Sequence, residues 1–147
     1  MDVKEYLKKV RELDNAIQFK DAQREEIINE MAAVRAVSYD KDRVQSSPSG
    51  DQMVNLMIRL EELAGDINKM RTEYFTQKND IINQIILLHD PRYADLLYKH
   101  YVEYKSLEKI AADMNYSYDH IRRLHRAAKK SFAETYPDFV DMPHNAT

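Results

Sequence analysis

Basic side chains that could bind a polyanion are concentrated in one segment near the carboxyl-terminal end of the chain. Between Ser117 and Lys130, five Lys or Arg residues stand against one Asp, so the local formal charge is +4. The whole chain, in contrast, carries a formal net charge of −3. A positive patch on an acidic protein indicates a localised contact with phosphate groups.

Helical periodicity separates these basic residues from apolar residues of the same segment. Ile121, Leu124, Ala128 and Phe132 recur at helical spacing and predict a buried face. The opposite face is polar and basic, which is typical of a recognition helix that enters the major groove of DNA. The residues that we expect to bind DNA are Ser117, Tyr118, Asp119, His120, Arg122, Arg123, Arg126, Lys129 and Lys130.

The side-chain types on this face suit different parts of a DNA duplex. Arg122, Arg123 and Arg126 are the best candidates, because a guanidinium group pairs with a guanine edge or with phosphate. Tyr118 and Asp119, at the start of the helix, suit a thymine methyl and a cytosine amino group respectively. Lys129 and Lys130, farther along the helix, are expected to reach only the phosphate backbone.

The residues before this helix complete the pattern of a helix-turn-helix. Ala111 is small where two short helices would cross, and Asn115 tolerates the left-handed backbone of the turn. Ser106 and Ser117 precede the two helices and suit N-caps. The crossing would be buried by Ile110, Met114, Ile121 and Leu124, with Tyr116 folded back as an apolar plug. The alternative is that the basic residues form only the solvated face of a terminal amphipathic helix.

Composition indicates which elements position this motif. The 147-residue chain has two Gly, four Pro, no Trp and no Cys, which favours an all-helical protein. The absence of Cys excludes disulfides, thiolate zinc sites and cysteine nucleophiles. No run approaches the ~20 apolar residues of a membrane span, and the amino terminus lacks the apolar core of a signal peptide. We therefore expect a cytoplasmic protein without a membrane partner.

Two long segments, residues 3–37 and 51–88, carry apolar residues at spacings that alternate between three and four. They predict coiled-coil-like helices about 50 Å and about 57 Å long, which match well enough to pair as an antiparallel hairpin. Residues 38–50 predict a loop, interpreted as a tether or as a contact with DNA or a partner. Further apolar residues favour a homodimer through this region, and they include Leu7, Phe19, Ile28, Met57, Phe75, Ile82 and Ile86.

The predicted architecture has three parts. A long helical hairpin that serves oligomerisation spans residues 1–88, a three-helix helix-turn-helix domain spans residues 90–136, and a flexible acidic tail spans residues 137–147. Asp90 and Pro91 suit the start of the domain's first helix. The domain is expected to pack on the end of the second long helix, near residues 85–88. Gly65 lies within that helix, where it permits a close crossing or a bend or is simply tolerated.

No catalytic, metal or cofactor site is predicted, and we do not expect an enzyme. His120 and His125 are five residues apart and diverge on a helix, whereas a shared ligand face needs a spacing of three or four. Each histidine is therefore expected at the surface or at its boundary. The carboxylates lie among Lys and Arg on helix faces, and the isolated glycines form no phosphate loop.

Two motifs carry a resemblance to a known family. Arg43–Asp51, which reads Arg-Val-Gln-Ser-Ser-Pro-Ser-Gly-Asp, and the segment Ser106–Ala128 resemble phage and prophage proteins of Gram-positive bacteria. That family is related to autolysin-regulatory and late-gene transcriptional regulators, and its carboxyl-terminal part is similar to region 4 of bacterial sigma factors. The resemblance covers roughly residues 40–133, and Asn115 departs from the Gly that is common at its position.

The resemblance implies a transcriptional regulator of phage genes that binds promoter DNA inside a bacterial host cell. By position it assigns contacts with bases and phosphates to Ser117, Tyr118, Asp119, Arg122, Arg123 and Arg126. Two other classes stay open. One is a DNA-packaging subunit of the phage small-terminase type, and the other is a helical interaction protein that binds RNA polymerase. The target DNA and the sign of regulation are not predicted.

Overall fold

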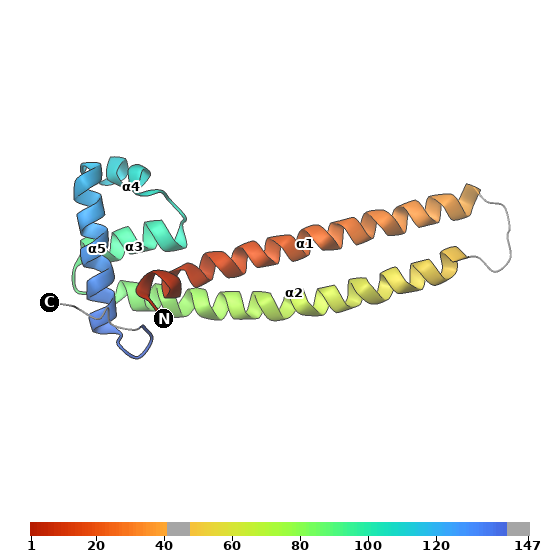
Figure 1. Cartoon of the computed structure of the whole chain (residues 1–147), viewed down its shortest axis with the longest axis horizontal. Helices are drawn as coiled ribbons and strands as arrows, with labels where there is room; N and C mark the ends of the chain where they lie inside the picture. Colours follow the sequence, from red (N-terminus) through yellow and green to blue (C-terminus); the bar gives the residue numbers. More distant parts are fainter. Residues whose placement is uncertain (41–47, 141–147) are drawn as a thin grey trace. The chain divides into compact units, whose positions relative to one another are not determined.

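The structure, a computed structural model, describes residues 1–40 and 48–140. These residues form helices and no strand, as Figure 1 shows. The elements are α1 (Val3–Asp40), α2 (Pro48–Ile86), α3 (Pro91–Leu97), η1 (Tyr98–Val102, a turn of π-helix), α4 (Leu107–Met114) and α5 (Tyr118–Thr135). The all-α prediction of two long helices followed by a small helical domain is confirmed.

Contacts divide the chain into two compact units. Unit 1 comprises residues 1–13 and the chain from Tyr74 onward, and unit 2 comprises residues 14–73. The division falls within α1 and within α2, whereas the sequence suggested a boundary near Asp90. The first turns of α1 and the last turns of α2 therefore belong to the same unit as the small helices.

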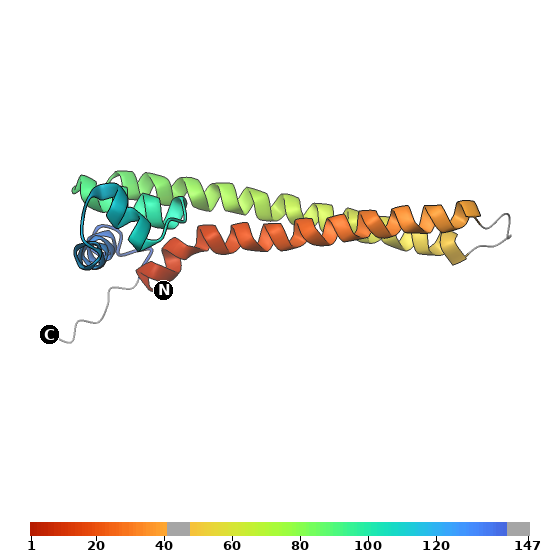
Figure 2. The same cartoon turned by 90° about the horizontal axis from the view of Figure 1, so that it is seen from above.

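Unit 2 is held together by the apolar stripes of the two long helices, which lie side by side in this unit (Figure 2). Ile27 and Val34 of α1 are buried against Leu56, Leu63 and Ile67 of α2. All five belong to the predicted stripes with spacings of three and four, so these stripes form the core of the unit. An ion pair between the Arg71 guanidinium and the Asp21 carboxylate, 3.3 Å apart, adds a polar contact at its surface.

The core of unit 1 joins the start of α1, the end of α2 and the small helices. Leu7, Ile85, Leu97 and Phe132 are fully buried in it. The Tyr6 hydroxyl donates to Oε1 of Gln84 (2.7 Å), and the Tyr136 hydroxyl donates to the Gln84 carbonyl oxygen (2.6 Å). The small domain thus packs on the end of α2 as predicted.

The predicted loop over residues 38–50 differs from the structure at both ends. Residues 38–40 continue α1, and α2 begins at Pro48. Proline suits the first turn of a helix, since its fixed φ is helical and its missing N–H would have no partner there. The rest of the predicted loop, residues 41–47, lies outside the described residues.

The first residues of the predicted flexible tail are packed in the structure. Val140 is 3% exposed and belongs to the core of unit 1. The Phe139 ring lies with its centroid 6.0 Å from that of Tyr6. Phe139 itself is 54% exposed, so burial of Val140 is the main apolar contribution that holds this segment against the signals for disorder from Pro137 and the acidic residues. Residues 141–147 lie outside the described part of the chain.

Membrane insertion was also assessed. None of the described helices combines the length and the apolar content that crossing a bilayer requires.

Candidate nucleic-acid interface

Two serine side chains cap the amino-terminal ends of α4 and α5. The backbone N–H of Lys109 donates to Ser106 Oγ at 3.2 Å, and the N–H of His120 donates to Ser117 Oγ at 3.1 Å. Each hydroxyl satisfies a backbone donor that has no partner within its helix. Both predicted N-caps are confirmed.

The turn between α4 and α5 depends on the backbone of Asn115. This residue is left-handed, with φ 59° and ψ 39°. Its N–H donates to the Ala112 carbonyl at 3.3 Å, and the N–H of Tyr116 donates to the Ala111 carbonyl at 2.9 Å. These two bonds form a Schellman motif, which ends α4 and redirects the chain within a few residues. Asn115 therefore fulfils the role that the sequence predicted for it.

A separate apolar cluster buries the crossing of the small helices. Leu96 of α3, Ile110 and Ala111 of α4, and Ile121 and Leu124 of α5 are its buried members. Ala111 is 5% exposed, so a larger side chain would have no room without separating the helices. The cluster fixes the orientation of α5 relative to α4. Partly buried residues at its edge include the predicted Met114 and Tyr116.

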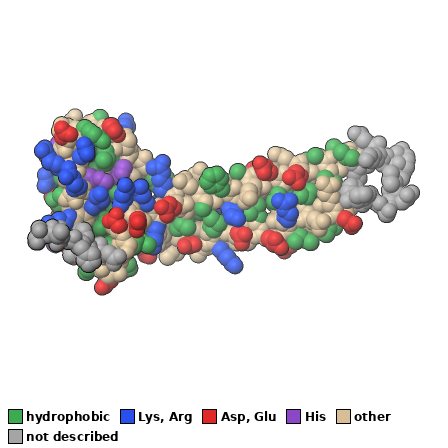
Figure 3. Space-filling view, in the orientation of Figure 1, with side chains coloured by type: hydrophobic (Ala, Val, Ile, Leu, Met, Phe, Trp, Pro, Cys, Tyr) green, Lys and Arg blue, Asp and Glu red, His purple; other side chains and the backbone are tan. Residues whose placement is uncertain are grey.

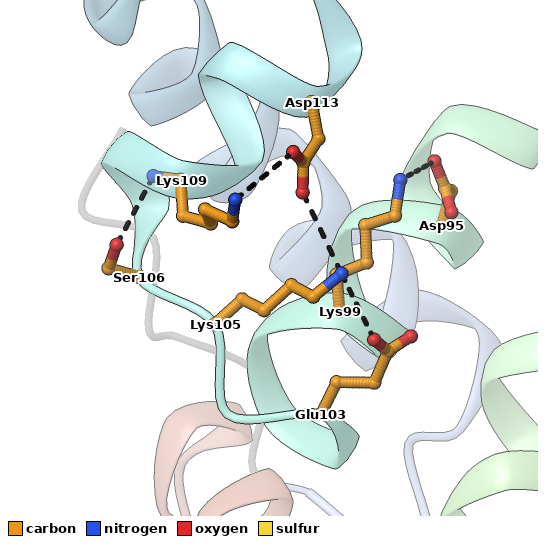
Figure 4. Close-up of polar contacts among 7 residues, drawn as sticks. All are labelled: Asp95, Lys99, Glu103, Lys105, Ser106, Lys109 and Asp113. Atoms are coloured by element: carbon orange, nitrogen blue, oxygen red, sulfur yellow. Dashed lines mark hydrogen bonds and ion pairs between the residues drawn. The ribbon is translucent and has the colours of Figure 1, made fainter.

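Ion pairs attach α4 to the end of η1, as the close-up in Figure 4 shows. The Lys105 ammonium lies 3.2 Å from a Glu103 carboxylate oxygen and 3.6 Å from one of Asp113. The hydrogen bond that the Lys105 ammonium donates to the Glu103 carboxylate is the main reason that the pKa of Lys105 is raised. Lys109 lies 3.8 Å from Asp113. The lysines at this end of α4 are thus compensated by carboxylates.

A cluster of aromatic rings joins η1 to α5. His100 Nδ1 donates to the Lys105 carbonyl oxygen at 2.7 Å, and the Tyr101 hydroxyl lies 2.8 Å from His125 Nε2. Burial, with further contributions from Lys129 and His100, lowers the pKa of His125 to about 3. His125 is therefore neutral, and its Nε2 accepts from Tyr101. This positioning contact was not predicted from the sequence, because no local spacing links residues 24 positions apart.

The predicted DNA-binding residues all lie on α5 or at its N-cap. Most are exposed, namely Ser117, Tyr118, Asp119, Arg122, Arg123, Arg126 and Lys130, whereas His120 and Lys129 are half-buried. The His120 ring packs on Tyr116, with 4.5 Å between ring centroids. Burial is also the largest cause of the lowered pKa of Lys129. The structure therefore brings the predicted residues together on one helix, with these two turned partly inward.

Among the described residues, the guanidinium groups of α5 have no acidic partners. Within the described ranges, no carboxylate forms an ion pair with Arg122, Arg123 or Arg126, in contrast to Lys105 and its neighbours. The Arg122 guanidinium lies 5.8 Å from the centroid of the Tyr118 ring. Figure 3 shows Lys and Arg side chains gathered over unit 1 beside histidine side chains. This arrangement leaves several cations available to a phosphate-bearing ligand.

Metal binding and similarity to known proteins were also assessed. In the described part of the chain, no group of three or more His, Asp or Glu side chains is placed to hold a metal ion.

No protein-family model, no curated protein and no solved structure matches the chain. The class of activity is therefore inferred from the geometry and charge of α4 and α5.

Proposed function

We propose that this protein binds duplex DNA through the helix-turn-helix of α4 and α5. The observation that carries the proposal is the row of exposed guanidinium groups on α5, which pair with no carboxylate of residues 1–40 or 48–140. The left-handed turn at Asn115 and the buried crossing at Ala111 support it, because a generic helical hairpin requires neither.

In the proposed complex, α5 enters the major groove. Tyr118, Asp119 and Arg122 lie in its amino-terminal turns, which approach base edges most closely in this class of motif. Arg side chains pair with guanine O6 and N7, and such contacts discriminate between bases. Lys130, farther along the helix, is suited to phosphate, which positions the protein without reading sequence.

The cellular role that we propose is transcriptional regulation of phage or prophage genes. Its support is the resemblance of residues 40–133 to phage regulators with a region-4-like motif. A domain of this size reads few base pairs, so we further propose that two copies act together. Unit 2 exposes Val54, Met57 and Ile58 to 54%, 54% and 50%, which gives a second copy an apolar surface to cover.

Selection of bound duplexes from a random DNA pool, followed by sequencing, tests the proposal. We expect a short enriched motif, and a palindromic motif if a two-fold dimer binds. The matched control is the same selection with the Arg122→Ala/Arg123→Ala protein, which should enrich no motif. Failure of the wild-type protein to bind DNA in a salt-dependent manner would refute the proposal.

The apolar side chains of unit 2 also favour a second candidate, a helical protein that binds RNA polymerase. A protein of this class should bind RNA polymerase. In isolation it should show no affinity for DNA. A phage small-terminase-type subunit would also bind DNA, but as a ring of many subunits. The oligomeric state in solution, together with the DNA selection, separates these possibilities.

A further inference from the structure

A second basic stripe lies on the first turns of α1, within unit 1. Lys4, Lys8 and Arg11 follow one another at spacings of four and three, so they share one face of the helix. All three side chains are exposed. The neighbouring Leu7 and Val10 are fully buried in the core of unit 1. The core therefore fixes the direction in which the basic stripe faces.

This part of α1 packs beside the carboxyl-terminal half of α5, as Figure 1 shows. The Tyr6 and Phe132 ring centroids are 5.9 Å apart, and Leu7 shares a core with Ala128 and Phe132. The basic stripe of α1 and the basic face of α5 therefore belong to adjacent helices of the same packed unit.

The two sets of positive charges approach each other at Lys129. On α5, Arg122, Arg126 and Lys129 are spaced by four and three residues and share a face. The charges of Lys4 and Lys8 act on Lys129, and with its burial they lower its pKa, while Asp2 opposes them. Together with the packing of Tyr6 against Phe132, this places the positive charges of α1 near the carboxyl-terminal half of α5.

Arg11 extends the basic stripe of α1 toward the connection between η1 and α4. Its guanidinium lies 5.3 Å from the centroid of the Tyr104 ring. Nowhere in the described residues does a carboxylate form an ion pair with Lys4, Lys8 or Arg11. Like charges that are held close together repel one another, and a bound polyanion removes that repulsion.

We propose that Lys4, Lys8 and Arg11 form a phosphate-binding strip for the DNA backbone next to the base pairs that α5 reads. The inference rests on the proposed DNA binding and adds to it a contact from outside the helix-turn-helix. Lysine and arginine bind phosphate without distinguishing sequence, so the strip contributes affinity and orientation.

The test compares salt dependence of DNA binding for the full chain and its variants by fluorescence anisotropy. Each lost phosphate contact should reduce the slope of log K against log salt concentration by about 0.9. The Lys4→Gln/Lys8→Gln protein should therefore lose about 1.8 from the slope, and Arg11→Gln about 0.9. Lys69→Gln removes the charge of an exposed lysine from unit 2 and should leave the slope unchanged.

Two further measurements separate a phosphate strip from a structural role. Lys4→Arg/Lys8→Arg keeps both charges and should retain the wild-type slope. The base preference of Lys4→Gln/Lys8→Gln should match that of the wild type, because phosphate contacts carry no sequence information. Thermal unfolding of each variant establishes that the exposed substitutions leave the fold intact.

The outcomes distinguish this inference from the proposed function. An unchanged slope in Lys4→Gln/Lys8→Gln, with binding lost in Arg122→Ala/Arg123→Ala, would refute the strip and leave the DNA-binding proposal in place. Absence of wild-type binding to DNA would refute both. Tighter wild-type binding to an RNA duplex than to a DNA duplex of the same sequence would assign the strip to RNA and overturn the inference.

Discussion

The arginines of α5 and the lysines near α4 differ in their surroundings. Lys105 and Lys109 lie beside the carboxylates of Glu103 or Asp113, whereas Arg122 and Arg123 have no such partner in the described part of the chain. The charges of these lysines are therefore partly neutralised within the domain, whereas those of the arginines are not neutralised by any described carboxylate, as the proposed DNA binding requires. Function on this domain is therefore expected on the face of α5.

Replacing the two adjacent arginines of α5 should weaken binding to the selected DNA site. We expect Arg122→Ala and Arg123→Ala each to cost about 1–3 kcal/mol if the guanidinium reads a base. A gel-shift titration measures the change in Kd. Lys109→Ala is the matched control, since its side chain pairs with Asp113, and its affinity should stay at the wild-type value. Equal affinities for Arg122→Ala/Arg123→Ala and wild type would exclude this face.

His125 should make stability depend on pH below neutrality. The fold lowers the pKa of His125 to about 3, whereas an unfolded histidine has a pKa of about 6.5. Between these values the unfolded state binds more protons, so the contribution is present above about pH 6.5 and is lost as the pH falls toward 3.

Urea unfolding of the wild type at pH 7 and pH 5 measures this loss of stability. The difference in free energy of unfolding between the two pH values should shrink in His125→Gln, which cannot titrate. His89→Gln removes an exposed histidine and should retain the wild-type difference. The same pH dependence in all three proteins would show that His125 is not held neutral by the fold.

At the scale of elements, the helices begin and end where short-range chemistry requires. Ser106 and Ser117 cap α4 and α5, Asp90 caps α3, and Asn115 ends α4. Each of these contacts spans at most a few residues, and each was predicted from the sequence. The end of α1 and the start of α2 differ from the prediction, since both lie within the predicted loop over residues 38–50. Pro48 contributed to the loop prediction, although proline also suits the first turn of a helix.

Gly65 lies within the continuous helix α2, and no packing contact requires glycine there. The residue is exposed, and a Cβ atom added to it would meet no other atom within 4 Å. No close crossing therefore requires glycine at this position. Gly65→Ala should raise the free energy of unfolding by up to about 1 kcal/mol, because alanine restricts the unfolded chain and favours helix.

Urea unfolding of Gly65→Ala and wild type gives the comparison. Ala64→Gly, at the preceding position of the same helix, is the reciprocal control and should lower stability by a similar or larger amount. A decrease in stability for Gly65→Ala would indicate that α2 needs glycine there for a bend.

For the molecule as a whole, the exposed apolar residues of unit 2 lead us to expect a homodimer. Val54, Met57 and Ile58 lie on α2 outside the core stripe of Leu56 and Leu63. A helix pair buries one stripe, and the remaining apolar surface is available to a second copy. We expect sedimentation equilibrium of the wild type to give a dimer mass.

A carboxylate introduced on the apolar surface formed by Val54, Met57 and Ile58 should weaken association of the two copies. Ile58→Glu places a carboxylate among apolar side chains and should shift the mass toward the monomer. Asn55→Glu adds the same charge to an exposed polar position of α2 and should leave the dimer intact. A monomeric wild type at micromolar concentration would contradict the dimer.

The sequence by itself determined the features that depend on neighbouring residues. Apolar spacing defines the buried faces of α1, α2 and α5, and a hydroxyl or amide at a helix end defines a cap. For the same reason, the buried crossing at Ala111 and the exposed guanidinium groups of α5 could be predicted. These signals span a few turns of helix, so they do not require the positions of distant segments.

Only the tertiary structure decided which distant segments share a core and a surface. Packing of Tyr6 against Phe132 places Lys4 and Lys8 near α5, although more than 100 residues separate them from it in the chain. The contact between Tyr101 and His125 and the burial of Val140 have the same origin. Such pairings depend on how whole helices bury their apolar stripes against one another. The residues adjacent in sequence therefore do not predict which distant segments come into contact.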